Sequence, residues 1–256
     1  MKLRNLLLLV SLGAIWGASY IFIRLAAPSF GSLWLIAVRL LIAGLTLLML
    51  IPLTGGRPAF RNRWWHYVIL GTVNAGVPFT LITNALTTLN VSTSAIINAI
   101  TPASTAVVAA FWIKDPLTPR KLAGLLLGMC GVVVLVGWNP LPLGRPTIVA
   151  ALQAIAATGL YGFGTVYVRV RFKDDTPMAL AIAQIFGAMV LQLPLAAFQP
   201  RPAPTLTATL SLVCLAVICT SLAYLIYFRL VANIGPARTS TVTFLVPFFS
   251  VIWAVL

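Results

Sequence analysis

The chain has 256 residues, of which 61% are hydrophobic and only 8% are charged. A soluble domain carries about 25% charged residues, so this chain cannot cover a water-facing surface and its solvent must be largely lipid. The net charge of +14 comes from 17 Lys and Arg against three acids. Because the basic residues lie mostly in short gaps between apolar runs, not on one basic face, we expect no nucleic-acid partner.

A membrane-spanning helix needs about 20 mostly apolar residues, and such runs follow one another along the whole chain. The first begins after Lys2 and Arg4 and continues to about Ala27 without a small-residue cleavage site, so it predicts a span and not a signal peptide. The gaps are rich in turn residues, and none is long enough for a soluble domain. The nine expected spans are approximately 5–26, 32–53, 65–87, 92–113, 118–138, 147–170, 177–198, 206–230 and 237–256.

The basic residues divide unequally between the two sides that alternating spans create. The side of the N-terminus collects thirteen Lys and Arg, and the opposite side keeps only Arg24, Arg39, Arg145 and Arg201. Short cytoplasmic loops carry an excess of Lys and Arg. We therefore expect a multi-pass protein of the inner (plasma) membrane with a cytoplasmic N-terminus.

An ungapped offset of 145 residues relates the two halves of the chain. Several matches of like residues at one offset indicate an internal duplication, whereas a single match would be chance in so apolar a sequence. The matches pair Trp16 with Tyr161, Gly17 with Gly162, Arg24 with Arg169, Ala43 with Ala188, Phe79 with Tyr224, and Pro102 with Pro247.

The duplication predicts an all-α integral membrane fold of two five-helix repeats, residues 1–145 and 146–256. Because five is odd, the second copy must enter the membrane from the opposite side. Inverted repeats of this kind let a transporter alternate which side is open. The fifth span, 118–138, predicts a counterpart beyond Leu256, so we expect a ten-helix fold whose last helix is missing from this chain. A natural nine-span protein is the alternative.

Several segments, each loose on its own, keep a characteristic order and spacing along nearly the whole chain. They are Trp16-Gly17 with Arg24, Arg39 within 35–44, Asn90 to Ala95 leading to Thr101-Pro102, Lys114 to Thr118, Ala223 to Leu230, Gly235 to Arg238, and Leu245 to Pro247. Together they resemble the EamA-like branch of the drug/metabolite transporter superfamily. The resemblance implies two inverted five-helix halves around a central cavity that moves a small metabolite. One departure is Asp115, where the family usually has Glu.

The titratable residues exclude most catalytic chemistry. The only acids are Asp115, Asp174 and Asp175, all in gaps between spans, and the only histidine is His66, near a span end. A carboxylate pair, a Ser-His-Asp triad or a metal site needs groups that this chain lacks. We therefore expect no enzymatic activity, no metal and no cofactor. With no carboxylate at membrane depth, we expect facilitated transport, or coupling through substrate charge, in preference to a proton relay.

Arg39 is the most informative charge, because it lies about seven residues inside the second span, roughly 10 Å deep at 1.5 Å per residue. An arginine there is costly unless it snorkels, meets a partner or lines a wet cavity. Two interpretations stay open. The side chain either snorkels to the outer interface and ties helices together, or attracts an anionic or carboxylate-bearing substrate.

Amides and aromatic rings inside the spans complete the candidate site. A single buried amide most often ties helices together, but several can supply the polar contacts of an apolar pocket. Kinks at Pro102 and Pro247 are candidate hinges, with static bends as the alternative. The sequence also predicts close helix contacts at Gly13 with Gly17 and at Gly124 with Gly128. The candidate substrate-binding residues are Trp16, Tyr20, Arg39, Asn74, Phe79, Asn98, Tyr161, Gln184 and Tyr224.

These features favour transmembrane transport of a small metabolite by alternating access, with efflux of amino acids or related metabolites preferred. A translocator of drug-like or lipid-linked amphiphiles is the nearest alternative. A non-transporting membrane scaffold subunit is an alternative of another class. The expected partners are a small-molecule substrate and the lipid bilayer, and the chain is compatible with a monomer or a homodimer.

Overall fold

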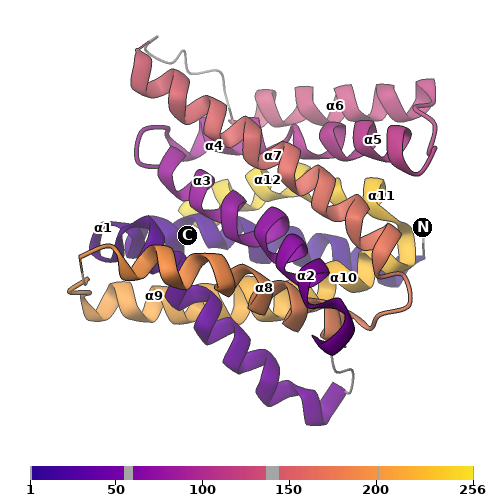
Figure 1. Cartoon of the computed structure of the whole chain (residues 1–256). Helices are drawn as coiled ribbons and strands as arrows, with labels where there is room; N and C mark the ends of the chain where they lie inside the picture. The colour runs from indigo at the N-terminus through magenta and orange to yellow at the C-terminus, as the bar shows by residue number, and fades with distance from the viewer. Residues whose placement is uncertain (1, 55–59, 137–143, 201, 256) are drawn as a thin grey trace.

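A computed structural model describes residues 2–54, 60–136, 144–200 and 202–255. Within these residues every regular element is a helix and none is a strand (Figure 1). The predicted all-α class is therefore confirmed. The helices of the described ranges fall on the nine expected spans, and some of those spans consist of two or three consecutive helical pieces.

The first two spans are the two arms of α1, Leu3–Thr54. The arms meet at Gly31, whose φ of 68° and ψ of 163° are not helical. Only glycine takes such a backbone conformation without a steric penalty. The chain turns at this residue, so Gly31 ends the first span within a few residues of the expected boundary (Figure 1).

The third span is one continuous rod with a π-helical segment in its middle. Its pieces are α2, Phe60–Gly71, η1, Thr72–Gly76, and α3, Val77–Ala85. The fourth span is broken, with α4, Val91–Asn98, followed by α5, Thr101–Trp112. The fifth span is α6, Pro119–Val136, which packs against α12 and α4 at the edge of the molecule in Figure 1.

The second half of the chain repeats this order of elements. Two long helices come first, α7, Arg145–Arg171, and α8, Pro177–Ala197. A rod with a central π segment follows, and then a broken span. These pieces are α9, Leu206–Ala216, η2, Val217–Leu222, α10, Ala223–Ile234, α11, Pro236–Ser240, and α12, Val242–Val255.

The two π segments lie at equivalent places in the two halves. Thr72 begins η1 and Val217 begins η2, and these residues are 145 positions apart. A π segment is rare, occurs mostly as a single turn inside an α-helix and is frequent at functional sites. The two halves therefore share a rare backbone feature at the same 145-residue offset that relates their matching residues.

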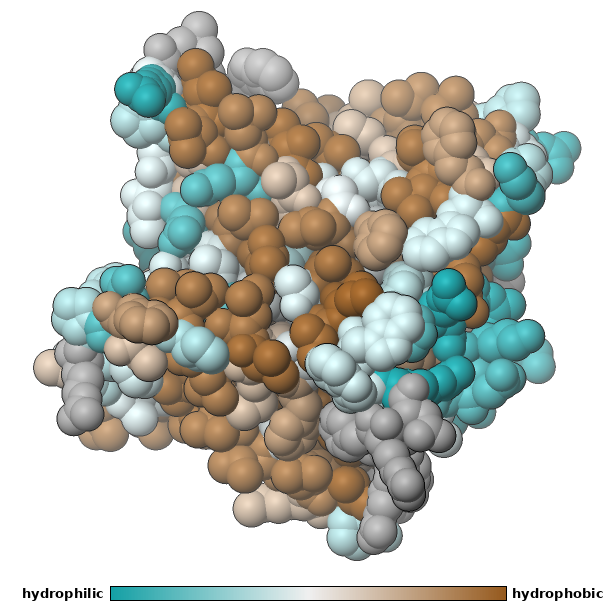
Figure 2. All heavy atoms as spheres, viewed as in Figure 1, coloured by the Kyte–Doolittle hydropathy of each residue, from teal (hydrophilic) through white to brown (hydrophobic). Residues whose placement is uncertain are grey.

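Helix length and surface polarity suit a lipid environment. Among the described residues, five helices are long and apolar enough to cross a membrane, and the first of them, within α1, contains two arms. Hydrophilic residues gather toward the two ends of the helices, and brown, apolar residues cover most of the band between them (Figure 2). The N-terminus and the turns after α5, α7 and α10 lie at the same end, at the right of Figure 1.

Small residues allow the closest helix contacts. A Cβ added at Gly187 of α8 would overlap the backbone of Tyr67 in α2, and one at Gly71 would overlap the backbone of α8 around Ala188. Gly13 and Gly17 of α1 meet α12, where added Cβ atoms would lie 2.7 Å from the Cβ atoms of Leu245 and Phe249, respectively.

The second predicted glycine pair is only half right. A Cβ on Gly128 would meet the ring of Phe244, but one on Gly124 would have no described atom within 4 Å. The two residues are one helical turn apart, and of the two only Gly128 faces a side chain of α12 closely. Gly124 therefore makes no close helix contact with the described residues.

The two candidate hinge prolines are not equivalent in the structure. Pro102 lies in the first turn of α5, directly after the break at 99–100, where its missing N–H is not needed by the helix. Pro247 lies inside α12, and the break of that span is earlier, at Thr241. Only Pro102 therefore adjoins a helix break, and kinks at the two prolines stay a prediction. Movement at either position stays a prediction.

Candidate functional site

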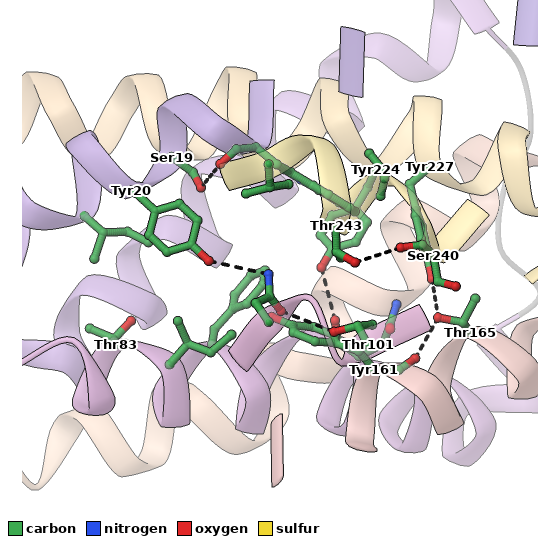
Figure 3. A pocket seen from close by; sticks show the side chains of 18 of the residues that line it. Ser19, Tyr20, Thr83, Thr101, Tyr161, Thr165, Tyr224, Tyr227, Ser240 and Thr243 are labelled. Atoms are coloured by element: carbon green, nitrogen blue, oxygen red, sulfur yellow. Dashed lines mark hydrogen bonds between the residues drawn. The ribbon is translucent and has the colours of Figure 1, made fainter. Parts of the chain in front are cut away.

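A cavity of about 100 Å³ lies between the two halves, with room for several water molecules at roughly 10–15 Å³ each. Its walls come from α1, η1, α3, α4 and α5 of the first half, and from α7, α10, α11 and α12 of the second (Figure 3). Aromatic rings, hydroxyls and amides dominate the lining. The lining residues are Trp16, Ser19, Tyr20, Ile23, Arg39, Asn74, Phe79, Ile82, Thr83, Asn98, Thr101, Tyr161, Thr165, Tyr224, Tyr227, Ser240, Val242, Thr243 and Val246.

Eight of the nine candidate residues line this one cavity: Trp16, Tyr20, Arg39, Asn74, Phe79, Asn98, Tyr161 and Tyr224. The ninth, Gln184, is fully buried behind Asn74 and accepts a hydrogen bond from its Nδ2 at 2.5 Å. Gln184 therefore supports a lining residue and does not itself reach the cavity. That these residues contact a substrate stays a prediction.

Arg39 is buried and held in place by the second half of the chain. Its side chain is 4% exposed, which excludes a snorkelling position at the interface. Nε donates a hydrogen bond to Oγ1 of Thr220 in η2 at 2.7 Å. The guanidinium carbon lies 4.0 Å from the centroid of the Phe79 ring, within the range of a cation–π contact. Arg39 therefore ties the second span to the eighth and also faces the cavity.

Hydroxyls and amides form short chains along the cavity wall (Figure 3). Asn98 donates to the hydroxyl of Tyr20 at 3.4 Å and accepts from Thr101 at 3.2 Å. On the opposite wall the hydroxyls of Thr165 and Tyr227 are 2.6 Å apart. These bonds fix the rotamers of the polar groups, so the wall presents them in a defined arrangement.

Aromatic rings from both halves pack into a continuous surface. Trp16 contacts Tyr224 and Tyr227 with ring centroids 6.2 and 5.6 Å apart. Phe79 and Tyr224, which are matched by the internal repeat, are stacked at 6.4 Å. Such rings offer a large apolar surface with few rotatable bonds, and the Tyr hydroxyls add polar contacts at its edge.

The first π segment faces this site, and side chains from the other half donate hydrogen bonds to two of its carbonyl groups. A π turn leaves the regular i to i−4 bonding pattern, so some carbonyls need other donors. The hydroxyl of Tyr224 donates to the Asn74 carbonyl at 3.1 Å. Nε2 of Gln192 donates to the Gly76 carbonyl at 2.8 Å.

In the second π segment, hydroxyl side chains of the segment itself donate to the carbonyls at the end of α9. Oγ1 of Thr220 donates to the Leu215 carbonyl at 2.8 Å, five residues earlier in the chain. Oγ of Ser221 is close to two carbonyls, that of Ala216 at 3.1 Å and that of Ala43 in α1 at 3.0 Å. Through Thr220, this segment also positions Arg39.

The cavity lining follows the internal repeat more closely than the sequence matches suggested. Six pairs of lining residues are 145 positions apart, and each pair combines two different amino acids. They are Trp16 with Tyr161, Tyr20 with Thr165, Phe79 with Tyr224, Ile82 with Tyr227, Asn98 with Thr243, and Thr101 with Val246.

Sequence reasoning missed several polar lining residues, namely Thr83, Thr165, Ser240 and Thr243. Each is an ordinary hydroxyl residue in an apolar helix, where such residues most often bond to their own backbone. The repeat held the missing signal for two of them, because the 145-residue offset leads from Tyr20 to Thr165 and from Asn98 to Thr243.

Comparison with known proteins gives related transporters over the full length. The chain is 25% identical over 260 residues to the uncharacterized transporter YvbV of Bacillus subtilis, covering 98% of this chain and 83% of that protein. It is 27% identical over 268 residues to the uncharacterized inner membrane transporter YedA of Escherichia coli K12, with the same coverage. An uncharacterized transporter of Archaeoglobus fulgidus is 26% identical over 272 residues, covering 99% and 89%.

A solved crystal structure shares the fold. It superposes with a TM-score of 0.79 at 18% sequence identity, covering 100% of this chain and 88% of the other. The sequence also matches the EamA-like transporter family twice, over residues 3–137 and 148–256. The chain is a membrane transporter protein that belongs to the EamA-like transporter family.

Proposed function

We propose that this protein exports amino acids or related small metabolites across the inner membrane, through alternating exposure of the central cavity to the two sides. The observation that carries the proposal is the cavity itself. It lies between the halves, both halves line it, and its wall combines a broad aromatic surface with a few oriented polar groups. Sites for small organic solutes have this composition, and transporters hold them at the interface of their repeats.

We further propose that residues 1–145 and 146–256 are inverted copies of one unit. The six lining pairs and the two π segments support a duplication, since all are related by the same 145-residue offset. If the copies are inverted, an equivalent movement in each half opens opposite sides of the membrane. We place the N-terminus in the cytoplasm, because the basic residues are concentrated on its side.

A blocked cavity tests transport. Ile82 lines the cavity, and Ile82→Trp adds a large ring there, whereas Leu127 is 73% exposed on the lipid-facing surface of α6. We expect wild type and Leu127→Trp to export labelled amino acids or related metabolites from loaded proteoliposomes, and Ile82→Trp to lose most of that flux. Equal flux in both variants would place the pathway elsewhere.

Cysteine labelling tests the inverted arrangement. In a background free of Cys130, Cys214 and Cys219, single cysteines are placed after the second arm of α1 and after α8. Membrane-impermeant reagents should label these two sites from opposite sides. Labelling from the same side would contradict the inversion without affecting the transport proposal.

A further inference from the structure

We propose that Arg39 is the anion subsite of the central cavity, and that the preferred solute carries one carboxylate and a net charge of −1. This inference rests on the proposed function and narrows its substrate class. Neutral and cationic relatives of the solute are then poor substrates, and zwitterions are intermediate.

The charge balance of the cavity is the first observation. Among the described residues that line the cavity, Arg39 is the only charged one. The whole sequence has three acids, and none can neutralise it. Asp175 is bound to Arg63 at 2.7 Å, Asp115 is bound to Lys121 at 2.8 Å, and Asp174 is exposed in the turn before α8. The cavity therefore carries a fixed charge of +1, because a guanidinium does not lose its proton in a protein.

The hydrogen-bond donors of Arg39 are the second observation. A guanidinium has five N–H donors in a planar fork. The bond to Thr220 uses the Nε donor, and the described residues supply no other hydrogen-bond acceptor or ion pair to this side chain. The four donors on the two terminal nitrogens are left for water or solute. This fork matches the two oxygens of a carboxylate, which can accept two parallel bonds.

Net charge separates an acid from a zwitterion. A buried charge without a partner is costly, and the cost is largest at membrane depth. A monoanion bound at Arg39 leaves the occluded cavity neutral. A zwitterion leaves a net charge of +1, and a cation raises it to +2. The rings of Trp16, Phe79 and Tyr224 then provide a surface for an apolar body attached to the carboxylate.

The charge belongs to one half only. The residue 145 positions after Arg39 is Gln184, which is neutral, fully buried and bonded to Asn74. The solute therefore meets the cation on the wall of the first half.

The empty carrier must change conformation with an unpaired guanidinium in its centre, whereas in the loaded carrier the solute pairs with that guanidinium. Exchange of one anion for another should consequently be faster than net flux.

A series of four probes separates charge from shape. Leucine, N-acetylleucine, leucinamide and N-acetylleucinamide share one side chain and are, respectively, zwitterionic, anionic, cationic and neutral. The four phenylalanine counterparts repeat the test with a larger body. Binding is measured by thermal shift and calorimetry on the purified full chain. In at least one of the two series, leucine or phenylalanine, we expect the N-acetyl acid to bind at least about tenfold more tightly than the corresponding N-acetyl amide, since hydrogen bonds to a charged group are stronger.

Variants assign that preference to Arg39. Arg39→Gln should bind acid and amide equally, and Arg39→Lys should keep part of the preference, because it retains the charge but not the planar fork. Arg24→Gln is the matched control, since Arg24 is an exposed arginine of α1 outside the cavity lining. The melting temperature of each variant without solute reports its folding separately.

Three outcomes would overturn the proposal. They are equal binding of acid and amide by wild type, a carboxylate preference that survives Arg39→Gln, and the absence of binding by any of the eight probes from a folded chain. Export that is blocked by Ile82→Trp would still support the proposed function in each case. If wild type shows the carboxylate preference in binding but exports no solute, the proposed function is contradicted and the proposal for Arg39 is not.

Discussion

At position 39 the first half of the chain carries an arginine that faces the cavity, and 145 residues later the second half carries a glutamine that lies behind its wall. Elsewhere the halves supply equivalent positions to the same cavity, as Trp16 and Tyr161 do. The order of helical elements is therefore the same in the two halves, while their polarity and charge differ. Under the proposed function, the positions at which the halves differ are the ones that select the solute.

Moving the charge to the other half should have the largest effect on the binding of a carboxylate solute. In the double variant Arg39→Gln with Gln184→Arg, the guanidinium is placed behind Asn74, where no side chain can neutralise it. We expect a loss of about 2–5 kcal/mol in binding of a carboxylate solute, the range found when one partner of a buried charge pair is removed. Calorimetry with N-acetylleucine measures it. Recovery of wild-type affinity would mean that the two positions are interchangeable.

The contact between α2 and α8 joins the halves through glycines, and its disruption should be the next largest effect. Gly187→Ala places a Cβ against the backbone of Tyr67, which cannot move aside as a flexible side chain could. Overpacking of this kind costs about 1–3 kcal/mol and occasionally more. The melting temperature in detergent should fall clearly. Gly131→Ala is the control, since its Cβ meets no described atom within 4 Å, and an equal fall there would contradict the packing argument.

The two π segments should differ in what stabilises them. Gln192 of α8 donates to the first segment from a distant helix, whereas Ser221 lies within the second segment. We expect Gln192→Leu to cost about 1–3 kcal/mol, because it removes the buried hydrogen bonds of Gln192 to the Gly76 carbonyl and to Oγ1 of Thr80. Ser221→Ala should cost about 1 kcal/mol or less. Denaturant or thermal unfolding compares the two, and a larger effect at Ser221 would reverse the assignment.

The ion pair at the helix ends should have the smallest effect. Arg63 and Asp175 join the two halves at 2.7 Å, but the arginine side chain is 40% exposed. Exposed pairs of this kind contribute about 0–1 kcal/mol. Asp175→Asn should therefore lower the melting temperature only slightly and leave the carboxylate preference unchanged. A large change in that preference would show that charge outside the cavity controls selectivity.

The sequence predicted the spans well because a membrane imposes length and hydropathy on each helix. It also pointed to the cavity, which eight of the nine candidate residues line, since polar and aromatic residues at membrane depth are costly or conspicuous. Arg39 and Asn74 stood out for this reason.

The sequence alone did not predict which way a side chain points around its helix axis. Gln184 and Asn74 are both span amides, yet only Asn74 faces the cavity, because Gln184 lies in the contact between α8 and η1. The π segments also could not be foreseen, since the donors that stabilise the first one, Tyr224 and Gln192, come from other helices. Gly124 shows the same limit, because a glycine spacing does not reveal which turn the neighbouring helix covers.

Flux of N-acetylleucine into and out of proteoliposomes tests most directly that the cavity is the pathway and that Arg39 selects its solute. We predict flux in wild type and Arg24→Gln that is stimulated by the same anion on the opposite side, and strongly reduced flux in both Ile82→Trp and Arg39→Gln. Unchanged flux of the anion in either cavity variant would contradict the central claim.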